Sequence, residues 1–139
     1  MNEQRETAAG NGFTIPDKLP SLNEYQNACR ANRYVGAKFK RDTESIITIT
    51  IAKALQSGQL RRPALPIRIV FEWHEKTRRR DADNIASAKK FILDAMQTMG
   101  IIPNDNRKCV VGFTDEIIDD RHDFVNVNII EVKGGGGSL

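Results

Sequence analysis

Residues 76–106 read KTRRRDADNIASAKKFILDAMQTMGIIPNDN. Four of the first five residues are basic, Asp81-Ala82-Asp83 follows them, and a loop carrying Asp105 closes the stretch. Phosphodiester chemistry needs cations that hold the nucleic-acid backbone and carboxylates that hold a metal ion. Because the stretch places both kinds of side chain next to each other, it indicates a site for that chemistry.

A helix is predicted from Asn84 to Met99. Its apolar residues recur at steps of three and four, which gives one buried stripe. Gly100 suits the left-handed position after a helix end, and Pro103 prevents the helix from resuming. The stripe consists of Ile85, Ala88, Phe91, Ile92, Ala95, Met96 and Met99.

The opposite face of this predicted helix is polar. At about 100° per residue, Asp83, Ser87, Lys90 and Asp94 fall together, whereas Lys89 falls at the edge of the apolar stripe. This geometry favours Lys90 over Lys89 as the functional lysine.

Asp81 and Asp83 are two residues apart, so in an extended chain their side chains point the same way. Two converging carboxylates suit Mg²⁺, a hard cation that takes oxygen ligands and keeps several waters. A structural alternative is that Asp83 caps the helix and Asp81 pairs with an arginine.

The complete string is more specific than the D-x-D spacing alone. It resembles the RusA-type Holliday junction resolvases, a family of phage and prophage endonucleases. The likeness covers roughly residues 13–132, including Phe13-Thr14-Ile15-Pro16 and Leu22-Asn23-Glu24-Tyr25. The central matches are Arg79-Arg80-Asp81-x-Asp83-Asn84, Leu93-Asp94-Ala95, Gly100-Ile101 and Asp105.

The resemblance implies that Asp81, Asp83 and Asp105 are catalytic carboxylates that bind Mg²⁺, with Mn²⁺ as an alternative. Ser87 stands where the family's short form has its catalytic lysine. Counting back from Asp94 reaches Lys90 instead, although Lys89 remains open. The second acid of the family's loop pair is replaced here by Asn104.

Positive charge is the second functional signal. The net charge is +3 and the pI about 9.0, which is compatible with nucleic-acid binding. Five basic residues and no acids lie between Arg30 and Arg41, with Tyr34 and Phe39 among them, and this segment suits phosphate contact and base stacking. An ordinary solvated face with two core aromatics is the alternative. The DNA-binding candidates are Arg33, Lys38, Lys40, Arg41, Lys76, Arg78, Arg79 and Arg80.

The 139 residues predict one domain over residues 13–133, a disordered segment over 1–12 and a flexible Gly-rich tail over 134–139. Cys29 and Cys109 indicate neither a disulfide framework nor a zinc site. No signal region or membrane-spanning stretch is evident, so a cytoplasmic location is expected.

The remaining elements predict an α/β or α+β domain with a small mixed sheet and packed helices. Strands are expected over 13–15, 67–73, 108–115 and 124–132. A helix is expected over 21–31, capped by Ser21 with Glu24 in a capping box. Residues 42–57 read as a helix capped by Asp42 or Thr43, although 46–51 also alternates like a strand.

Two further features are assigned structural roles. His74 follows a strand and is expected to be structural. The acidic cluster of Asp115, Glu116, Asp119, Asp120 and Asp123 is expected in a solvated turn facing away from bound DNA.

The resemblance implies Mg²⁺-dependent cleavage of four-way DNA junctions in recombination and repair, by a homodimer whose two-fold symmetry suits the substrate. A non-catalytic DNA-binding module and a purely structural protein are the alternatives. A continuous helix over 84–99 would be about 24 Å long, and six residues reach at most about 20 Å. Asp105 is therefore expected to join Asp81 and Asp83 of the other subunit.

Overall fold

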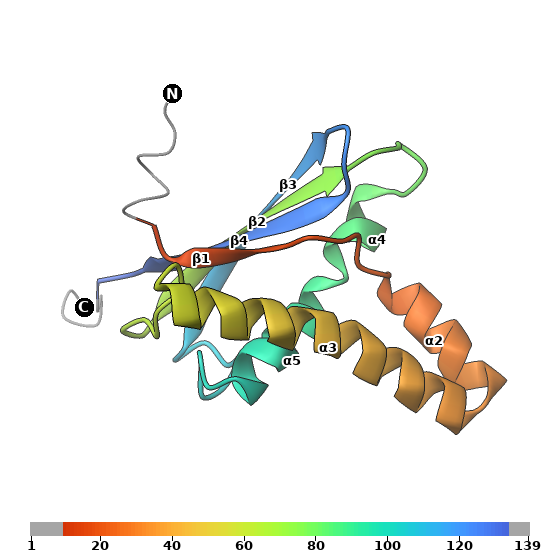
Figure 1. Cartoon of the computed structure of the whole chain (residues 1–139), viewed down its shortest axis with the longest axis horizontal. Coiled ribbons are helices and arrows are strands. Elements are labelled where there is room, and N and C mark those ends of the chain that lie inside the picture. Colours follow the sequence, from red (N-terminus) through yellow and green to blue (C-terminus); the bar gives the residue numbers. More distant parts are fainter. Residues whose placement is uncertain (1–9, 134–139) are drawn as a thin grey trace.

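The computed structural model describes residues 10–133, which form one four-stranded sheet and its helices (Figure 1). In chain order the elements are β1 (Gly12–Ile15), α2 (Leu22–Ala31), α3 (Arg33–Ser57), β2 (Ile67–Glu75), α4 (Ala82–Ala86), α5 (Lys89–Thr98), β3 (Val110–Asp119) and β4 (Phe124–Glu131). The predicted mixed α+β architecture is confirmed.

The sheet has the order β1-β4-β2-β3. β2 runs parallel to β3 and antiparallel to β4, which in turn pairs antiparallel with β1. The central strand β2 is strongly alternating, because Ile67, Ile69, Phe71 and Trp73 are buried while Arg68 is exposed. β4 alternates in a similar way, with Val125, Val127 and Ile129 buried.

The helices α3 and α5 lie on the same side of the sheet, where they cover its apolar face (Figure 1). Phe91, Ile92 and Met96 of α5 and Ile47 and Ile51 of α3 are fully or almost fully buried there. Among residues 10–133, no helix covers the opposite face of the sheet.

The helix α2 begins as predicted. Ser21 accepts a hydrogen bond from the backbone N–H of Glu24, and the Glu24 side chain accepts one from the backbone N–H of Ser21. Gly58 and Gly100 adopt φ values of 81° and 73°, the left-handed region expected after a helix.

The helix α3 is longer than the sequence indicates. It begins at Arg33 rather than near Asp42, because Asn32 accepts hydrogen bonds from the backbone N–H groups of Tyr34 and Val35. The helix predicted over 42–57 is confirmed, but its predicted caps Asp42 and Thr43 lie inside α3, and the strand alternative for 46–51 is excluded.

The predicted continuous helix over 84–99 is also wrong. It is divided into α4 and α5 by a turn at Ser87 and Ala88. The Ser87 hydroxyl donates to the backbone carbonyl of Asn84 at 2.6 Å and accepts from the backbone N–H of Leu22 at 3.1 Å. Hydroxyl groups that bond backbone within their own turn compete with regular helix.

The prediction of disorder holds for neither Asn11 nor Gly12. Asn11 is buried and bonds both the backbone N–H and the carbonyl of Arg61, and Gly12 begins β1. Residues 1–9 and 134–139, also predicted disordered or flexible, lie outside the described residues. Within 10–133, no helix is long and apolar enough to cross a membrane.

Candidate functional site

Both aspartates of the D-x-D motif have exposed side chains at the start of α4. Asp81 holds the N-cap position in an extended conformation, but its side chain makes no capping hydrogen bond. The Asp83 carboxylate accepts from the neighbouring backbone N–H of Asn84 at 3.0 Å. Within residues 10–133 neither aspartate forms an ion pair, so the structural alternative of an Asp83 cap and an Asp81–arginine pair is wrong.

Arg80, a predicted DNA contact, is engaged inside the protein. Its guanidinium donates to Glu75 Oε2 at 2.7 Å and to the backbone carbonyl of Leu19 at 2.9 Å. Both charged side chains are largely buried, with 18% of Arg80 and 7% of Glu75 exposed. This pair joins the end of β2 to the segment before α2, so it fixes where the D-x-D motif leaves the sheet.

The other cations of the motif are open to solvent. Arg78 donates from Nε to Asp119 Oδ2 at 3.0 Å, but its side chain remains 84% exposed. Arg79 and Lys76 are exposed, and neither side chain forms an ion pair within residues 10–133. These three residues can therefore contact a phosphate, whereas Arg80 would first have to leave Glu75.

Lys89 and Lys90 have different environments. Lys89 Nζ donates to Asp115 Oδ2 at 2.6 Å and lies 5.5 Å and 4.8 Å from the ring centroids of Phe71 and Phe113. Lys90 Nζ donates to Asp94 Oδ1 at 3.0 Å and its side chain is 53% exposed. Lys89 therefore binds the sheet edge, and Lys90 remains available to a ligand.

Lys90 belongs to a charged cluster that joins α3 to α5. Lys40 Nζ lies 3.6 Å from Asp94 Oδ2 and 3.8 Å from Glu44 Oε2. The hydrogen bond to Asp94 raises the pKa of Lys90, and the charges of Asp94, Asp105 and Glu44 add to this effect. Burial raises the pKa of Glu44, whose Oε2 atom has no hydrogen-bond partner among the described residues.

Glu44 was not recognised from the sequence. Its signal is the spacing of four residues from Lys40, which makes the two side chains neighbours on a helix. The signal was missed because the helix was predicted to begin only at Asp42.

Asp105 is exposed in the loop that follows α5. The loop is shaped by Asn104, which accepts from the backbone N–H of Asn106 at 2.9 Å, and by Asn106, which accepts from that of Lys108 at 3.0 Å. The negative charge of Asp105 contributes to the raised pKa of Lys90.

The three predicted metal ligands are not gathered within one chain. Across residues 10–133, no three His, Cys, Asp or Glu side chains lie close enough together to hold a metal ion. The structure does supply Asp81 and Asp83, two exposed carboxylates two residues apart. This partial donor set fits Mg²⁺, which is commonly held by one or two carboxylates plus waters.

No protein-family model matches the chain, and no curated protein matches it. The functional assignment therefore depends on the geometry of the site and on the resemblance of its motif.

The predicted DNA-binding segment, Arg30–Arg41, spans the end of α2 and the first turns of α3. Arg33 lies over the Tyr34 ring at 5.3 Å, and Tyr34 is 73% exposed. Lys38 pairs with Asp42 at 2.6 Å, and Lys40 belongs to the cluster with Asp94. The segment presents the exposed cation Arg41 and an exposed aromatic ring, whereas Phe39 is half-buried against Tyr25.

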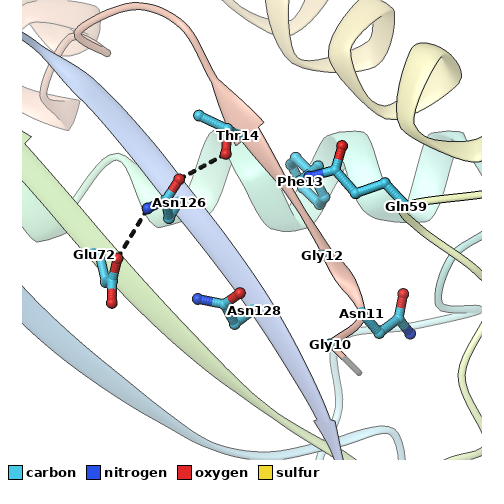
Figure 2. A pocket seen from close by; sticks show the side chains of 9 residues that line it. All are labelled: Gly10, Asn11, Gly12, Phe13, Thr14, Gln59, Glu72, Asn126 and Asn128. Carbon is cyan, nitrogen blue, oxygen red and sulfur yellow. Dashed lines mark hydrogen bonds between the residues drawn. The ribbon is translucent and has the colours of Figure 1, made fainter. Parts of the chain in front are cut away.

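A separate polar hollow of about 540 Å³ lies over β1 and β4, and Figure 2 shows its lining. Thr14 Oγ1 donates to Asn126 Oδ1 at 2.6 Å, and Asn126 Nδ2 donates to Glu72 Oε1 at 2.9 Å. None of the predicted site residues lines this hollow.

His74 lies inside β2 rather than after the strand, and its side chain has partners within the protein, as the predicted structural role requires. Its Nδ1 atom lies 2.8 Å from Asp120 Oδ2, and its ring stacks on Phe124 with centroids 3.9 Å apart. The hydrogen bond from His74 lowers the pKa of Asp120.

The acidic cluster differs from its prediction. Asp115, Glu116 and Asp119 lie in β3 rather than in a turn. Asp115 pairs with Lys89 and Asp119 with Arg78, so part of the cluster lies beside the motif and not away from it.

Proposed function

We propose that this protein is a metal-dependent endonuclease that cleaves branched DNA, with the four-way junction as its preferred substrate. The observation that carries the proposal is the D-x-D motif itself. Asp81 and Asp83 are exposed and free of ion pairs within residues 10–133, although four of the five residues before Asp81 are basic. Two exposed carboxylates at this spacing can hold Mg²⁺ together with waters.

Asp81 and Asp83 would hold Mg²⁺, and the family resemblance adds Asp105 as a further ligand. When bound, the ion supplies an activated water and stabilises negative charge on the phosphate. A complete site would take Asp105 from the second subunit of a homodimer, because residues 10–133 of a single chain bring no such triad together.

Lys90 would stabilise charge on the scissile phosphate. Its raised pKa keeps the ammonium protonated, and Asp94 orients it through the 3.0 Å hydrogen bond. A fixed cation acts most strongly where negative charge develops during the reaction.

Phosphates flanking the cut would be held by Lys76, Arg78 and Arg79, with Arg33 and Arg41 contributing from α3. Tyr34 offers an exposed ring on which an unpaired base at a branch point can stack.

A non-catalytic DNA-binding module is the second candidate. The absence of a three-acid group within residues 10–133 favours this candidate, because two carboxylates bind a metal ion more weakly than three.

Nicking of a synthetic four-way junction tests the proposal. Cleavage should require Mg²⁺ and should stop in Asp83→Asn, while junction binding in Ca²⁺ is retained or becomes tighter because a negative charge near phosphate is removed. Asp17→Asn is the matched control, since it removes the same charge from another exposed position.

Cleavage by Asp83→Asn within a few-fold of the unmodified protein would overturn the metal-site assignment. Binding of the junction without any cleavage by the unmodified protein would favour the DNA-binding module.

A further inference from the structure

Four charged side chains form a chain of alternating sign between α3 and α5. Glu44 and Lys40 belong to α3, and Asp94 and Lys90 belong to α5. Lys40 Nζ lies 3.8 Å from Glu44 Oε2 and 3.6 Å from Asp94 Oδ2. Lys90 Nζ lies 3.0 Å from the other carboxylate oxygen of Asp94. Lys40 is therefore placed between two carboxylates at almost equal distances, whereas Lys90 pairs with Asp94 alone among residues 10–133.

The two oxygens of Asp94 serve different cations. Oδ1 accepts the hydrogen bond from Lys90, while Oδ2 faces Lys40 across a distance that is too long for a hydrogen bond. A move of Lys40 toward Asp94 would make it a direct competitor of Lys90 for this carboxylate. Glu44 opposes that move, because it lies one helical turn from Lys40 and attracts the same ammonium group. The hydrogen bond that orients Lys90 thus depends on a glutamate of the neighbouring helix.

The environment of Glu44 differs from that of an ordinary surface acid. Its side chain is 23% exposed, and its Oε2 atom is buried with no hydrogen-bond partner among the described residues. Burial raises the pKa of Glu44, and a buried carboxylate oxygen without a hydrogen bond costs stability. The pair of Lys38 and Asp42 has the same spacing on α3, but it is joined at 2.6 Å and its side chains are 68% and 63% exposed. Stability alone therefore does not explain an acid at the position of Glu44.

We propose that Glu44 is a positioning residue for Lys90. It holds Lys40 at a distance from Asp94, so that Asp94 remains available to orient the Lys90 ammonium group. The inference rests on the proposed function only for the task of Lys90 at the scissile phosphate. Glu44 acts through Lys40 and Asp94 and is not a catalytic residue.

A purely structural role for these four charges is the competing interpretation. In that case Lys40 and Glu44 would only tie α3 to α5, and removal of both would harm the protein at least as much as removal of Glu44 alone. In the positioning role, a second substitution that removes Lys40 also removes the competitor for Asp94, so it should reverse the effect of the first. The two interpretations therefore predict opposite effects of the second substitution.

Single-turnover cleavage of a four-way junction in Mg²⁺ tests the positioning role. Glu44→Gln should lower the cleavage rate at saturating enzyme about tenfold, because a displaced Lys90 stabilises the phosphate less well. The enzyme concentration that gives the half-maximal rate should stay the same or fall, since a negative charge near the DNA is lost. Lys40→Gln added to Glu44→Gln should restore most of the rate. In a Lys90→Ala background, Glu44→Gln should have no further effect on the rate.

A second measurement needs neither DNA nor metal. NMR titration of the Lys90 ε-methylene group in the full chain reports the pKa of Lys90. Glu44→Gln should lower this pKa, because a nearby negative charge disappears and Lys40 moves toward Asp94. The variant that carries both Glu44→Gln and Lys40→Gln should return the pKa close to that of the unmodified chain.

Asp42→Asn is the matched control. It removes the same charge from a lysine–acid pair with the same spacing on the same helix, but that pair is exposed and includes no residue of α5. The cleavage rate and the pKa of Lys90 should both equal those of the unmodified chain. Circular dichroism and urea unfolding of every variant establish that α3 remains folded.

An unchanged pKa of Lys90 in Glu44→Gln would overturn the proposal. So would a further loss of rate when Lys40→Gln is added, or equal effects of Asp42→Asn and Glu44→Gln. If the unmodified chain does not cleave the junction, the proposed activity fails, while the titration of Lys90 still decides the role of Glu44. The two failures are therefore distinguishable.

Discussion

Lys89 and Lys90 are adjacent in the sequence, but their side chains have different partners. Lys89 is 22% exposed and is bonded to Asp115 beside two aromatic rings, whereas Lys90 is 53% exposed beside Asp94. The helix periodicity of the sequence predicted this difference, because it placed Lys89 at the edge of the apolar stripe.

Lys90→Ala is expected to lower the rate of junction cleavage about 100-fold or more, because it removes a cation from the proposed phosphate site. Its unfolding free energy should change by less than about 0.5 kcal/mol. Lys89→Ala should instead lose about 1–2 kcal/mol of stability with a smaller loss of activity, since it breaks a hydrogen bond to a charged group. Single-turnover cleavage and urea unfolding of both variants measure the two effects, and a more damaging Lys89→Ala in cleavage would reverse the assignment.

Alanine substitutions of Arg79 and Arg80 should likewise have different effects. Arg80→Ala leaves the buried Glu75 carboxylate without its partner and should cost about 3 kcal/mol of stability. Arg79→Ala should leave stability unchanged but reduce the slope of log K against log salt by about 0.9 for duplex DNA, because one phosphate contact is lost. Fluorescence titrations at several salt concentrations test this, and an unaltered slope in Arg79→Ala would exclude it from the DNA interface.

The ends of the helices could be predicted where the residues that set them contact only their sequence neighbours. The start of α2 and the ends of α3 and α5 were predicted correctly, because Ser21, Glu24, Gly58 and Gly100 act through their own backbone neighbours. The turn at Ser87 was not predicted, since one of its two hydrogen bonds comes from Leu22, far away in the sequence. The same limit explains β3, whose acids pair with Lys89 and Arg78 of other segments.

Ser87→Ala tests the origin of that turn. The substitution removes the oxygen that accepts from the backbone N–H of Leu22, one of the N–H groups at the start of α2 that has no partner inside its helix. The expected loss is about 1 kcal/mol of unfolding free energy. Ser45→Ala, at an exposed position of α3, should change stability by less than about 0.5 kcal/mol. Equal losses of unfolding free energy in the two variants would show that the Ser87 hydrogen bonds do not stabilise the fold.

At the scale of the whole molecule, the candidate site depends on where Asp105 lies relative to Asp81 and Asp83. Asp81, Asp83 and Asp105 could each be identified as candidate ligands from the sequence. The relative positions of the segments before and after α5 could not be predicted, because tertiary contacts determine them. Within residues 10–133 no three-acid group forms.

Subunit mixing tests whether the site is shared. Asp83→Asn and Asp105→Asn proteins should each be inactive, and their mixture should recover Mg²⁺-dependent nicking, because one of the two sites in a mixed dimer contains neither substitution. Exchange is followed independently by energy transfer between labelled subunits. If exchange occurs and nicking does not return, each site is built within a single chain.

The position of β3 at the end of the sheet also has a consequence for handling the protein. A ten-residue strand with one unpaired edge and exposed Val111, Phe113 and Ile117 could template growth of a fibrillar sheet. The interspersed carboxylates of Asp115, Glu116 and Asp119 oppose such stacking through mutual repulsion. Replacing these three acids by the corresponding amides should therefore promote aggregation through β3, which light scattering measures, even where the fold itself survives.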